Sequence, residues 1–411
     1  MHSSSRTSRG SVYLPVLAAA AIVTVIGLSA MWISRLQARR VSLQRDKARA
    51  ELCAAAAIEF GLQRIYAVSS WRNMGTTWAD DLPLDEGTFS LTVTDPSDND
   101  LADSNEDAVV LTGIGQSGEA RHAMQVTVLA RRVPIDALKT CIHAGGELKV
   151  NSGKTAMILN APASTNGNLR IDGRLDGSAE AQTASGGGVV TGTLTVPSPT
   201  KDIPEASVVQ TYRDMAVTIP CPGSTMEKVV LGPQCNPWGM GSPDGVYYMD
   251  TLGNDLTIRY SRVCGTLIIR TGGKKVVLED AGLYEAYRSD YPVLIVDGDL
   301  EIKLKSTYML MMEMYLRTNY NPPSCPYHGH ADYDIMDMYP TRIHGLIYVT
   351  GTVLFKDSPQ ITGTVITRDR ATFDDFAELT YDPDLAENPP PGFRTIEMRL
   401  AQDSSQQYVI P

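Results

Sequence analysis

The sequence lacks several motifs that identify common enzymes and cofactor sites. It has no C-x-x-C pair, which excludes a zinc ribbon and a thioredoxin-like redox motif. It also has no G-x-S-x-G nucleophile elbow and no G-x-x-x-x-G-K-[ST] phosphate loop. An excess of positive charge is absent too. The formal net charge of −11 argues against a general nucleic-acid binder.

Aromatic residues are scarce, whereas turn-forming residues are plentiful. Phe, Trp and Tyr make up 7% of the chain, which contains 34 glycines and 24 prolines. This composition favours many short strands joined by turns over a helical enzyme. The 411 residues, 43% of them hydrophobic, are enough for two or three domains with packed cores.

Charged residues are absent from residues 11–34, which we expect to form a transmembrane helix. The apolar core, residues 12–33, contains 22 residues and would span about 33 Å as a helix. It is longer than the apolar region of a cleaved signal peptide. Small and apolar residues then continue at helical spacing: Leu36, Leu43, Ala50, Ala54, Ala57 and Gly61. The pattern predicts one helix of about 55 residues whose soluble part covers residues 35–70.

A short basic leader, residues 1–10 ending in Arg-Thr-Ser-Arg-Gly, precedes this helix. The arrangement resembles the N-terminus of type IV pilin-like proteins, especially large PilX-like minor pilins and pseudopilins. The resemblance implies cleavage by a prepilin peptidase between Gly10 and Ser11. Many pilins have a Glu at the fifth mature position, where this chain has Pro15, although some minor pseudopilins also lack that Glu.

The basic residues around the apolar segment bear on its orientation. Two precede it, Arg6 and Arg9, whereas six follow it: Arg35, Arg39, Arg40, Arg45, Lys47 and Arg49. A positive-inside count places the following chain in the cytoplasm. The pilin resemblance implies the opposite, a single-pass inner-membrane protein with its C-terminal domain in the periplasm or on the cell surface. We expect the second orientation, because large domains translocate despite their charge.

Residues 71–135 are expected to form a small antiparallel sheet. Apolar and polar residues alternate in residues 88–94, 108–112 and 124–129, as in half-buried strands. A helix followed by such strands is also the layout of a pilin headgroup. Residues 113–118 match G-x-G-x-x-G, but a strand pattern follows instead of a helix. We therefore interpret them as a Gly-rich hairpin turn.

An acidic segment separates the first two of these strands. Residues 95–107 contain five Asp and one Glu, and carboxylates are preferred calcium ligands. The candidate ligands are Asp95, Asp98, Asp100 and Asp103. The spacing lacks the Gly and the closing Glu of an EF-hand, so a solvated acidic loop is the alternative. No other cofactor is expected.

Residues 136–395 are expected to form a β-rich domain, with residues 396–411 as a C-terminal tail. Short units of Gly followed by alternating apolar residues resemble the rungs of a β-solenoid, although their irregular period leaves a β-sandwich open. The composition and sequence pattern of this region also resemble those of the β domain of PilX-like envelope proteins. Residues 343–365 predict three strands with tight turns, and residues 280–290 suggest a short helix.

Two further groups of residues were candidates for covalent or metal chemistry. Cys221 and Cys235 lie in a Pro/Gly-rich loop and are candidates for a disulfide, with buried free thiols as the alternative. Residues 325–334 offer one Cys, two His and two Asp as metal ligands. Their alternative is an ordinary loop with solvent-facing histidines.

Together these features predict an α+β protein: a long N-terminal transmembrane helix, a small antiparallel pilin-like sheet, and a β-solenoid-like or β-sandwich domain. The leading functional hypothesis is a non-enzymatic envelope protein for assembly, capping or adhesion of a type IV pilus or type II secretion-like filament. Its expected partners are the membrane and other pilin-like subunits or filament assembly proteins, not nucleic acid. The alternatives are a membrane-anchored β-helix carbohydrate-active enzyme and a glycan- or calcium-binding surface module.

Overall fold

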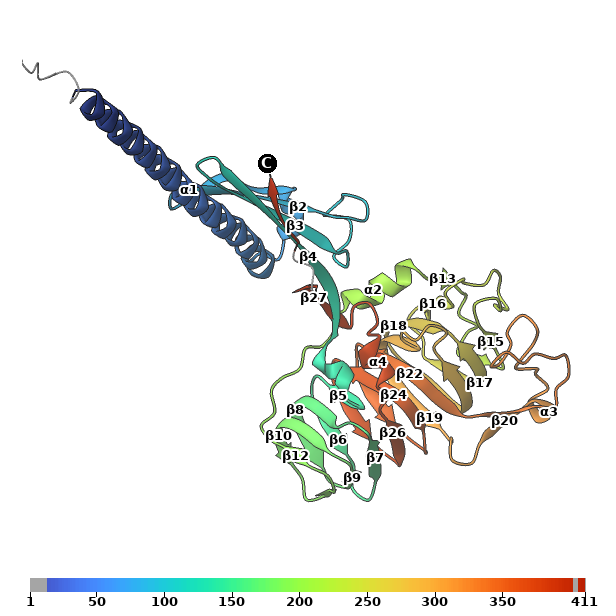
Figure 1. The fold of residues 1–411 in the computed structure, drawn as a ribbon. Coiled ribbons are helices and arrows are strands. Elements are labelled where there is room, and N and C mark those ends of the chain that lie inside the picture. Colours follow the sequence, from blue (N-terminus) through green and yellow to red (C-terminus); the bar gives the residue numbers. More distant parts are fainter. Residues whose placement is uncertain (1–12, 402–405, 411) are drawn as a thin grey trace, which may run out of the picture. The chain divides into compact units, whose positions relative to one another are not determined.

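The computed structural model describes residues 13–401 and 406–410, so the expected cleavage at Gly10–Ser11 lies outside the described residues. The chain divides into two compact units. The first comprises Met1–Arg131 and Ile396–Pro411, and the second comprises Arg132–Thr395. A long N-terminal helix followed by β-rich structure confirms the predicted α+β class (Figure 1).

The first unit begins with α1, Tyr13–Ala67, which is 55 residues long, as predicted. Pro15 does not interrupt it because it lies in the first turn, where an N–H has no partner within the helix. A short 3-10 helix, η1 at Trp71–Met74, follows. The strands of this unit are β1 (Thr77–Leu84), β2 (Gly87–Thr94), β3 (Val109–Ser117), β4 (Ala120–Pro134), β27 (Arg394–Leu400) and β28 (Gln406–Ile410).

These strands form one sheet in the order β1-β2-β3-β4-β27, with β28 also paired to β4. The pairings β1–β2, β2–β3, β3–β4 and β4–β28 are antiparallel. The three strands expected between residues 88 and 129 are therefore confirmed. Residues 396–411, expected as a tail, instead contribute strand residues that extend this sheet at β4.

The second half of α1 packs on the sheet through small residues. Ala50, Ala54 and Ala57 are at most 1% exposed, and Gly113 and Gly115 of β3 lie opposite them. A Cβ on Gly113 would lie 2.8 Å from the Ala54 carbonyl oxygen. The interpretation of residues 113–118 as a hairpin turn is therefore wrong for their first glycines, which are in mid-strand. These glycines are there because α1 leaves no room for side chains.

The second unit consists of strands, most of them short, with three short α-helices and one 3-10 helix. Its first strands are β5 (Ile142–Ala144), β6 (Leu148–Val150), β7 (Thr155–Leu159), β8 (Ala163–Ile171), β9 (Arg174–Asp176), β10 (Ala179–Ser185), β11 (Val189–Val190) and β12 (Leu194–Thr195). Then come β13 (Val217–Thr218), β14 (Thr225–Glu227), β15 (Val230–Leu231), β16 (Val246–Asp250), β17 (Leu256–Cys264), β18 (Thr266–Glu285), β19 (Leu294–Leu304), β20 (Leu310–Met312) and β21 (Met338–Pro340). The last are β22 (Arg342–Val349), β23 (Val353–Phe355), β24 (Gln360–Thr367), β25 (Ala371–Phe373) and β26 (Ala377–Thr380). The helices are η2 (Asp136–Lys139), α2 (Ser207–Asp214), α3 (Glu313–Leu316) and α4 (Asp384–Glu387).

All of these strands except β20 and β21 form one large sheet in which the described ladders are parallel, a solenoid-like stack of rungs. The rungs are not stacked in sequence order. Ile142 of β5 pairs with Val365 of β24 on one side and with Ala163 of β8 on the other. The first rung of the chain therefore lies between its last rung and its second, as the neighbouring β24, β5 and β8 illustrate (Figure 1).

Register-matched side chains fill the interior of the stack. One row runs through successive rungs as Tyr247, Leu267, Leu294, Ile347, Val365, Ile142, Ala163 and Ala179, each at most 1% exposed. Alternate residues of the same strands point outward and are also buried, among them Ile268, Ile295 and Tyr348. Tyr212 of α2 and Leu138 of η2 cover that outer face. Two buried faces explain why these strands read as continuous apolar runs.

One local prediction in this unit is wrong. Residues 280–290 were expected to form a helix, but β18 continues to Glu285. Its residues 282–285 pair with 261–264 of β17, and this parallel ladder overrides the local helical pattern. The three strands predicted within residues 343–365 are confirmed as β22, β23 and β24.

Candidate functional site

The first half of α1 is exposed on all sides. Every residue from 13 to 45 is exposed, including Val23 at 68% and Trp32 at 69%. Within the described residues, α1 is the one helix long and apolar enough to cross a membrane. Its apolar window has a mean hydropathy of 2.3 and is not buried against the protein. A surface this apolar requires a nonaqueous environment or a partner, which agrees with a single-pass membrane anchor.

The basic residues beyond the apolar segment lie close to the sheet. Arg45 and Arg49 both pair with Glu86, which lies in the turn between β1 and β2. All three side chains are partly solvent-exposed, so these pairs contribute at most modest stability. They join the helix to the β1–β2 turn near the point where α1 passes from exposed to buried.

The acidic loop brings together three of the four predicted calcium ligands. Asp95, Asp98 and Asp103 each offer one carboxylate oxygen, and these atoms all lie within 4.8 Å of one another. Asp100 lies outside this group, and its Oδ1 accepts a hydrogen bond from the Ala102 N–H. The loop thus gathers hard oxygen ligands in a small volume, the donor set that suits Ca²⁺.

Asp95 has an unusual environment for a carboxylate. Its side chain is fully buried at the end of β2. Its Oδ1 accepts a hydrogen bond from the Ser97 N–H at 2.7 Å, whereas its Oδ2 is buried with no hydrogen-bond partner. A buried carboxylate oxygen without a donor is costly, and a cation would remove that cost.

Arg72 anchors the acidic loop to the end of the helix. Its guanidinium donates to the carbonyl oxygens of Leu101 at 3.3 Å, Asn105 at 3.4 Å and Asp107 at 2.6 Å. It also lies over the Trp71 ring, 4.5 Å from the ring centroid. Desolvation lowers the pKa of Arg72, although nearby carboxylates oppose this shift. One side chain of η1 thus binds three main-chain carbonyls of the loop.

Mutual repulsion within the loop contributes to the pKa of one of its carboxyl groups. Desolvation, and then the charge of Asp98, raises the pKa of Asp103 above its ordinary value. Asp107 and Asp100 add to this effect. Like charges held this close favour either protonation or a bound cation.

Arg72 was not identified from the sequence, although its side chain binds three main-chain carbonyls of the acidic loop. Its acceptors are main-chain carbonyls 29 to 35 residues farther along the chain. Such contacts depend on how the loop returns to the helix, and no motif marks them in the sequence.

The candidate ligands in residues 325–334 do not form a metal site. Cys325 is buried beside Arg262, with the guanidinium 3.8 Å from its sulfur. Asp332 accepts hydrogen bonds from Asn319 and Asn321. Within the described part of the chain, the acidic-loop trio is the one group of three or more such ligands that comes together. Nor does the structure contain the Cys221–Cys235 disulfide, since all six cysteines are free.

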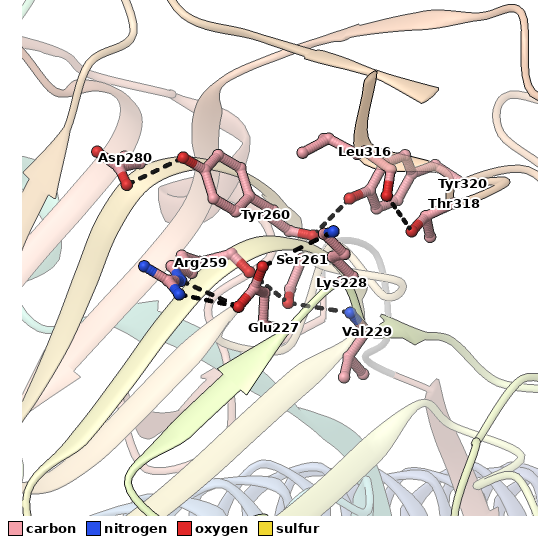
Figure 2. A network of polar contacts seen from close by, with 10 residues as sticks. All are labelled: Glu227, Lys228, Val229, Arg259, Tyr260, Ser261, Asp280, Leu316, Thr318 and Tyr320. Atoms are coloured by element: carbon pink, nitrogen blue, oxygen red, sulfur yellow. Dashed lines mark hydrogen bonds and ion pairs between the residues drawn. The ribbon is translucent and has the colours of Figure 1, made fainter. Parts of the chain in front are cut away.

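Carboxylates along the rungs are paired with basic residues of neighbouring strands. Figure 2 shows Glu227 of β14 bound by Arg259 of β17, at 2.9 and 3.2 Å. Similar pairs join Glu279 to Lys303 at 2.9 Å and Glu301 to Lys275 at 2.8 Å. These cross-strand pairs support the stacking of rungs.

Two adjacent carboxylates that follow β25, Asp374 and Asp375, also have partners. Asn151 donates to Asp374 at 2.7 Å, and Lys154 donates to Asp375 at 3.3 Å. These contacts join β25 and its following turn to the rung that contains β6. The two carboxylates thus have structural partners on a neighbouring rung.

Comparison with known proteins gives only distant likenesses. No protein-family model matches the chain, and no curated protein matches it in sequence. Among solved structures, the competence-associated pilin ComZ from Thermus thermophilus is similar at a TM-score of 0.36 and 13% identity. That alignment covers 89% of this chain and 98% of ComZ.

Two ice-binding proteins are also similar. A glycosylated one from an Arctic yeast has a TM-score of 0.29 and 10% identity, covering 61% of this chain and 94% of its own. One from Shewanella frigidimarina has a TM-score of 0.26 and 13% identity, covering 61% of this chain and 98% of its own domain. Scores this low do not by themselves identify a family or a function.

Proposed function

We propose that this protein is a membrane-anchored, pilin-like envelope protein that acts by assembly rather than by catalysis. The observation that carries the proposal is the division of α1 along its length. Residues 13–45 are exposed on every side, whereas Ala50, Ala54 and Ala57 are buried against a four-stranded antiparallel core. One continuous helix thus supplies both an anchor and the spine of a folded unit.

The exposed part of α1 is suited to contact with other helices in a membrane. Residues 18–21 are four consecutive alanines, and Gly27 has no atom within 4 Å of where its Cβ would be. Small residues let helices approach closely in lipid, where packing rather than the hydrophobic effect drives association. We infer that copies of this chain, or related subunits, associate through this segment in a type IV pilus or type II secretion-like filament.

The proposal places both folded units outside the cytoplasm, after removal of residues 1–10. It is tested by sequencing the mature N-terminus of the protein from cells with and without a prepilin peptidase. We expect the chain to begin at Ser11 only where the peptidase is present, and a Gly10→Val variant to remain uncut. An intact Met1 in peptidase-containing cells, or a cut far from Ser11, would contradict the proposal.

Orientation requires a separate measurement. Protease added to intact spheroplasts should digest the units beyond α1 while a cytoplasmic marker protein survives. Protection of the chain until the membrane is lysed would place these units in the cytoplasm and overturn the proposed localisation.

A second function, calcium binding by the acidic loop, is favoured by one specific observation. Asp95 Oδ2 is buried without a donor, and one carboxylate oxygen of Asp95 lies within 4.8 Å of carboxylate oxygens of Asp98 and Asp103. A cation there would compensate all three carboxylates. A ligand that binds only the folded state at a hundred times its Kd would stabilise the protein by about 2.7 kcal/mol.

Calorimetric titration of the full-length protein with Ca²⁺ tests this function. We expect one saturable site that Asp98→Asn and Asp103→Asn each weaken at least tenfold. Asp100→Asn is the matched control, because that side chain lies outside the trio and Asn retains the oxygen that caps Ala102. Absence of binding heat and of any thermal shift would leave the loop as solvated acidic surface.

A further inference from the structure

We propose that Cys235 and Cys325 are a redox-active pair that closes into a disulfide by exchange with a disulfide donor. The pair joins two loops of the second unit that are far apart in sequence. It is independent of the pilin-like role, because it concerns the chemistry of these loops in any compartment that contains a disulfide donor.

The two sulfurs meet over a glycine. Gly232 and Cys235 form an isolated antiparallel bridge, with N–H to oxygen distances of 2.9 and 3.0 Å. A Cβ on Gly232 would lie 2.5 Å from the Cys325 sulfur, so that sulfur occupies the space of the missing side chain. The bridge between Gly232 and Cys235 therefore brings the Cys325 sulfur next to Cys235, and each thiol shifts the pKa of the other. Cys221, the partner considered from sequence, is instead hydrogen-bonded to the carbonyl of Gly223.

A buried arginine holds the Cys325 loop in position. Arg262 of β17 is 2% exposed and donates to the carbonyl oxygens of Tyr320 at 2.6 Å, Cys325 at 2.8 Å and Pro326 at 2.8 Å. The Tyr320 hydroxyl in turn donates to the Tyr260 carbonyl at 2.6 Å, and both tyrosines appear in Figure 2. Cys325 is therefore fixed on the rungs rather than carried by a free loop.

The same arginine sets the charge balance around the pair. Among the described contacts Arg262 has no carboxylate partner, although a buried guanidinium ordinarily requires an anion. The hydrogen bond from Cys325 lowers the pKa of Cys235, with help from Ser324 and Arg262, although burial opposes it. The interaction with Cys235, together with burial, raises the pKa of Cys325. These opposite directions agree with Cys235 as the thiolate that attacks first and Cys325 as the resolving thiol.

Cys235 is also the more accessible of the two cysteines. A cavity of ≈ 380 Å³ is lined by Cys235, Lys228, Asn319 and Ser324. Cys325 is only 3% exposed. A donor therefore reaches Cys235 from this cavity, whereas Cys325 is buried and does not line it.

The exchange requires no oxidant other than the donor disulfide. The Cys235 thiolate attacks one sulfur of the donor disulfide, forms a mixed disulfide and releases the first donor thiolate. Cys325 then loses its proton and attacks the Cys235 sulfur, which releases the second donor thiolate. The two protein thiols lose two electrons and two protons in total, and the donor disulfide takes up the two electrons.

Peptide mapping of the full-length protein in detergent, reduced and then exposed to oxidised glutathione, tests the pairing. We expect a Cys235–Cys325 linked peptide in wild type and a glutathione adduct on Cys235 in Cys325→Ser. Cys264→Ser is the matched control, since Cys264 ends β17 beside the pair, and should form the same link. A Cys221–Cys235 link, or free Cys235 and Cys325 after prolonged oxidation, would overturn the proposal.

The order of attack is tested by the pH dependence of Cys235 alkylation with iodoacetamide. The titratable or charged groups around the pair are Arg262, Cys264, Tyr247 and Lys228. We expect the wild-type rate to follow an apparent pKa below the ordinary thiol value of about 8.5. The rate at pH 7 should fall about tenfold in Cys325→Ser, with a smaller loss in Ser324→Ala. An ordinary pKa for Cys235 in the wild type would contradict its role as the first nucleophile, and this measurement needs no variant.

Discussion

Gly115 of β3 lies directly against the carbonyl oxygen of Ala50 in α1, so closely that a Cβ on Gly115 would overlap it. Gly113 has the same relationship to Ala54, and Gly61 of the helix faces Leu91 and Leu111 of the sheet. Glycine and alanine on both sides thus set how near the helix comes to the sheet. No side chain of β3 separates helix and sheet at Gly113 and Gly115, whereas Leu91 and Leu111 fill the space opposite Gly61.

We expect Gly115→Ala to destabilise the first unit by about 1–3 kcal/mol, because the added methyl meets main-chain atoms that cannot move aside. Unfolding in urea, followed by fluorescence of the buried Trp71 and Trp78, measures this loss. Gly187→Ala in the second unit is the control, since no atom lies within 4 Å of its added Cβ. An equal midpoint for Gly115→Ala and wild type would show that the contact is not needed.

We expect Val23→Lys to impair membrane insertion. Val23 lies near the middle of the apolar segment, where a lysine costs about 3 kcal/mol on insertion scales. Alkaline extraction of membranes should release the variant and retain the wild type. Leu36→Lys provides the control, because it lies beyond the apolar core among existing basic residues and should stay membrane-bound. Retention of Val23→Lys would contradict the anchor.

We expect the second unit to lose stability as the pH falls below 6.5. Burial, and then the charge of Lys201, lowers the pKa of His143 to about 4, whereas the unfolded chain has the ordinary value. The unfolded state therefore binds the proton first, and stability decreases as pH falls from about 6.5 to about 4. From pH 7 to pH 5 the loss attributable to His143 is about 2 kcal/mol.

Urea unfolding of the wild type and His143→Gln at the two pH values measures this loss. The variant should be less stable at pH 7, because the ring contact with Ser164 at 2.7 Å is lost. It should nevertheless show a smaller difference between pH 7 and pH 5. An equal pH dependence in the two proteins would assign the acid sensitivity to other groups.

The acidic loop shows how far a candidate site can be predicted from composition alone. The residue types predicted oxygen ligands, and three of the four named carboxylates do converge. The exclusion of Asp100 follows from its turn, in which its oxygen caps the Ala102 N–H. The burial of Asp95 and the anchoring by Arg72 depend on the return of the loop to the helix, which no local pattern encodes.

The cysteines, in contrast, show a pairing that the sequence did not predict. Proximity in sequence suggested Cys221 with Cys235, whereas the structure places the Cys325 sulfur against Gly232, the bridge partner of Cys235. Pairing between loops is determined by which rungs carry them. Because Arg262 on β17 holds the Cys325 loop, the tertiary structure decides which cysteine lies beside Cys235.

By itself the sequence determined the long helix, the apolar anchor and the existence of short strands, because hydrophobic period and turn residues act within a few positions of each other. Only the tertiary structure decided that Gly113 and Gly115 lie in a strand under a helix and that Ile142 pairs with Val365. Stacking of parallel rungs satisfies main-chain hydrogen bonds equally well in several orders. The stacking order of the rungs is therefore selected by how well whole rungs fit against one another. That fit is not encoded in any single segment of the sequence.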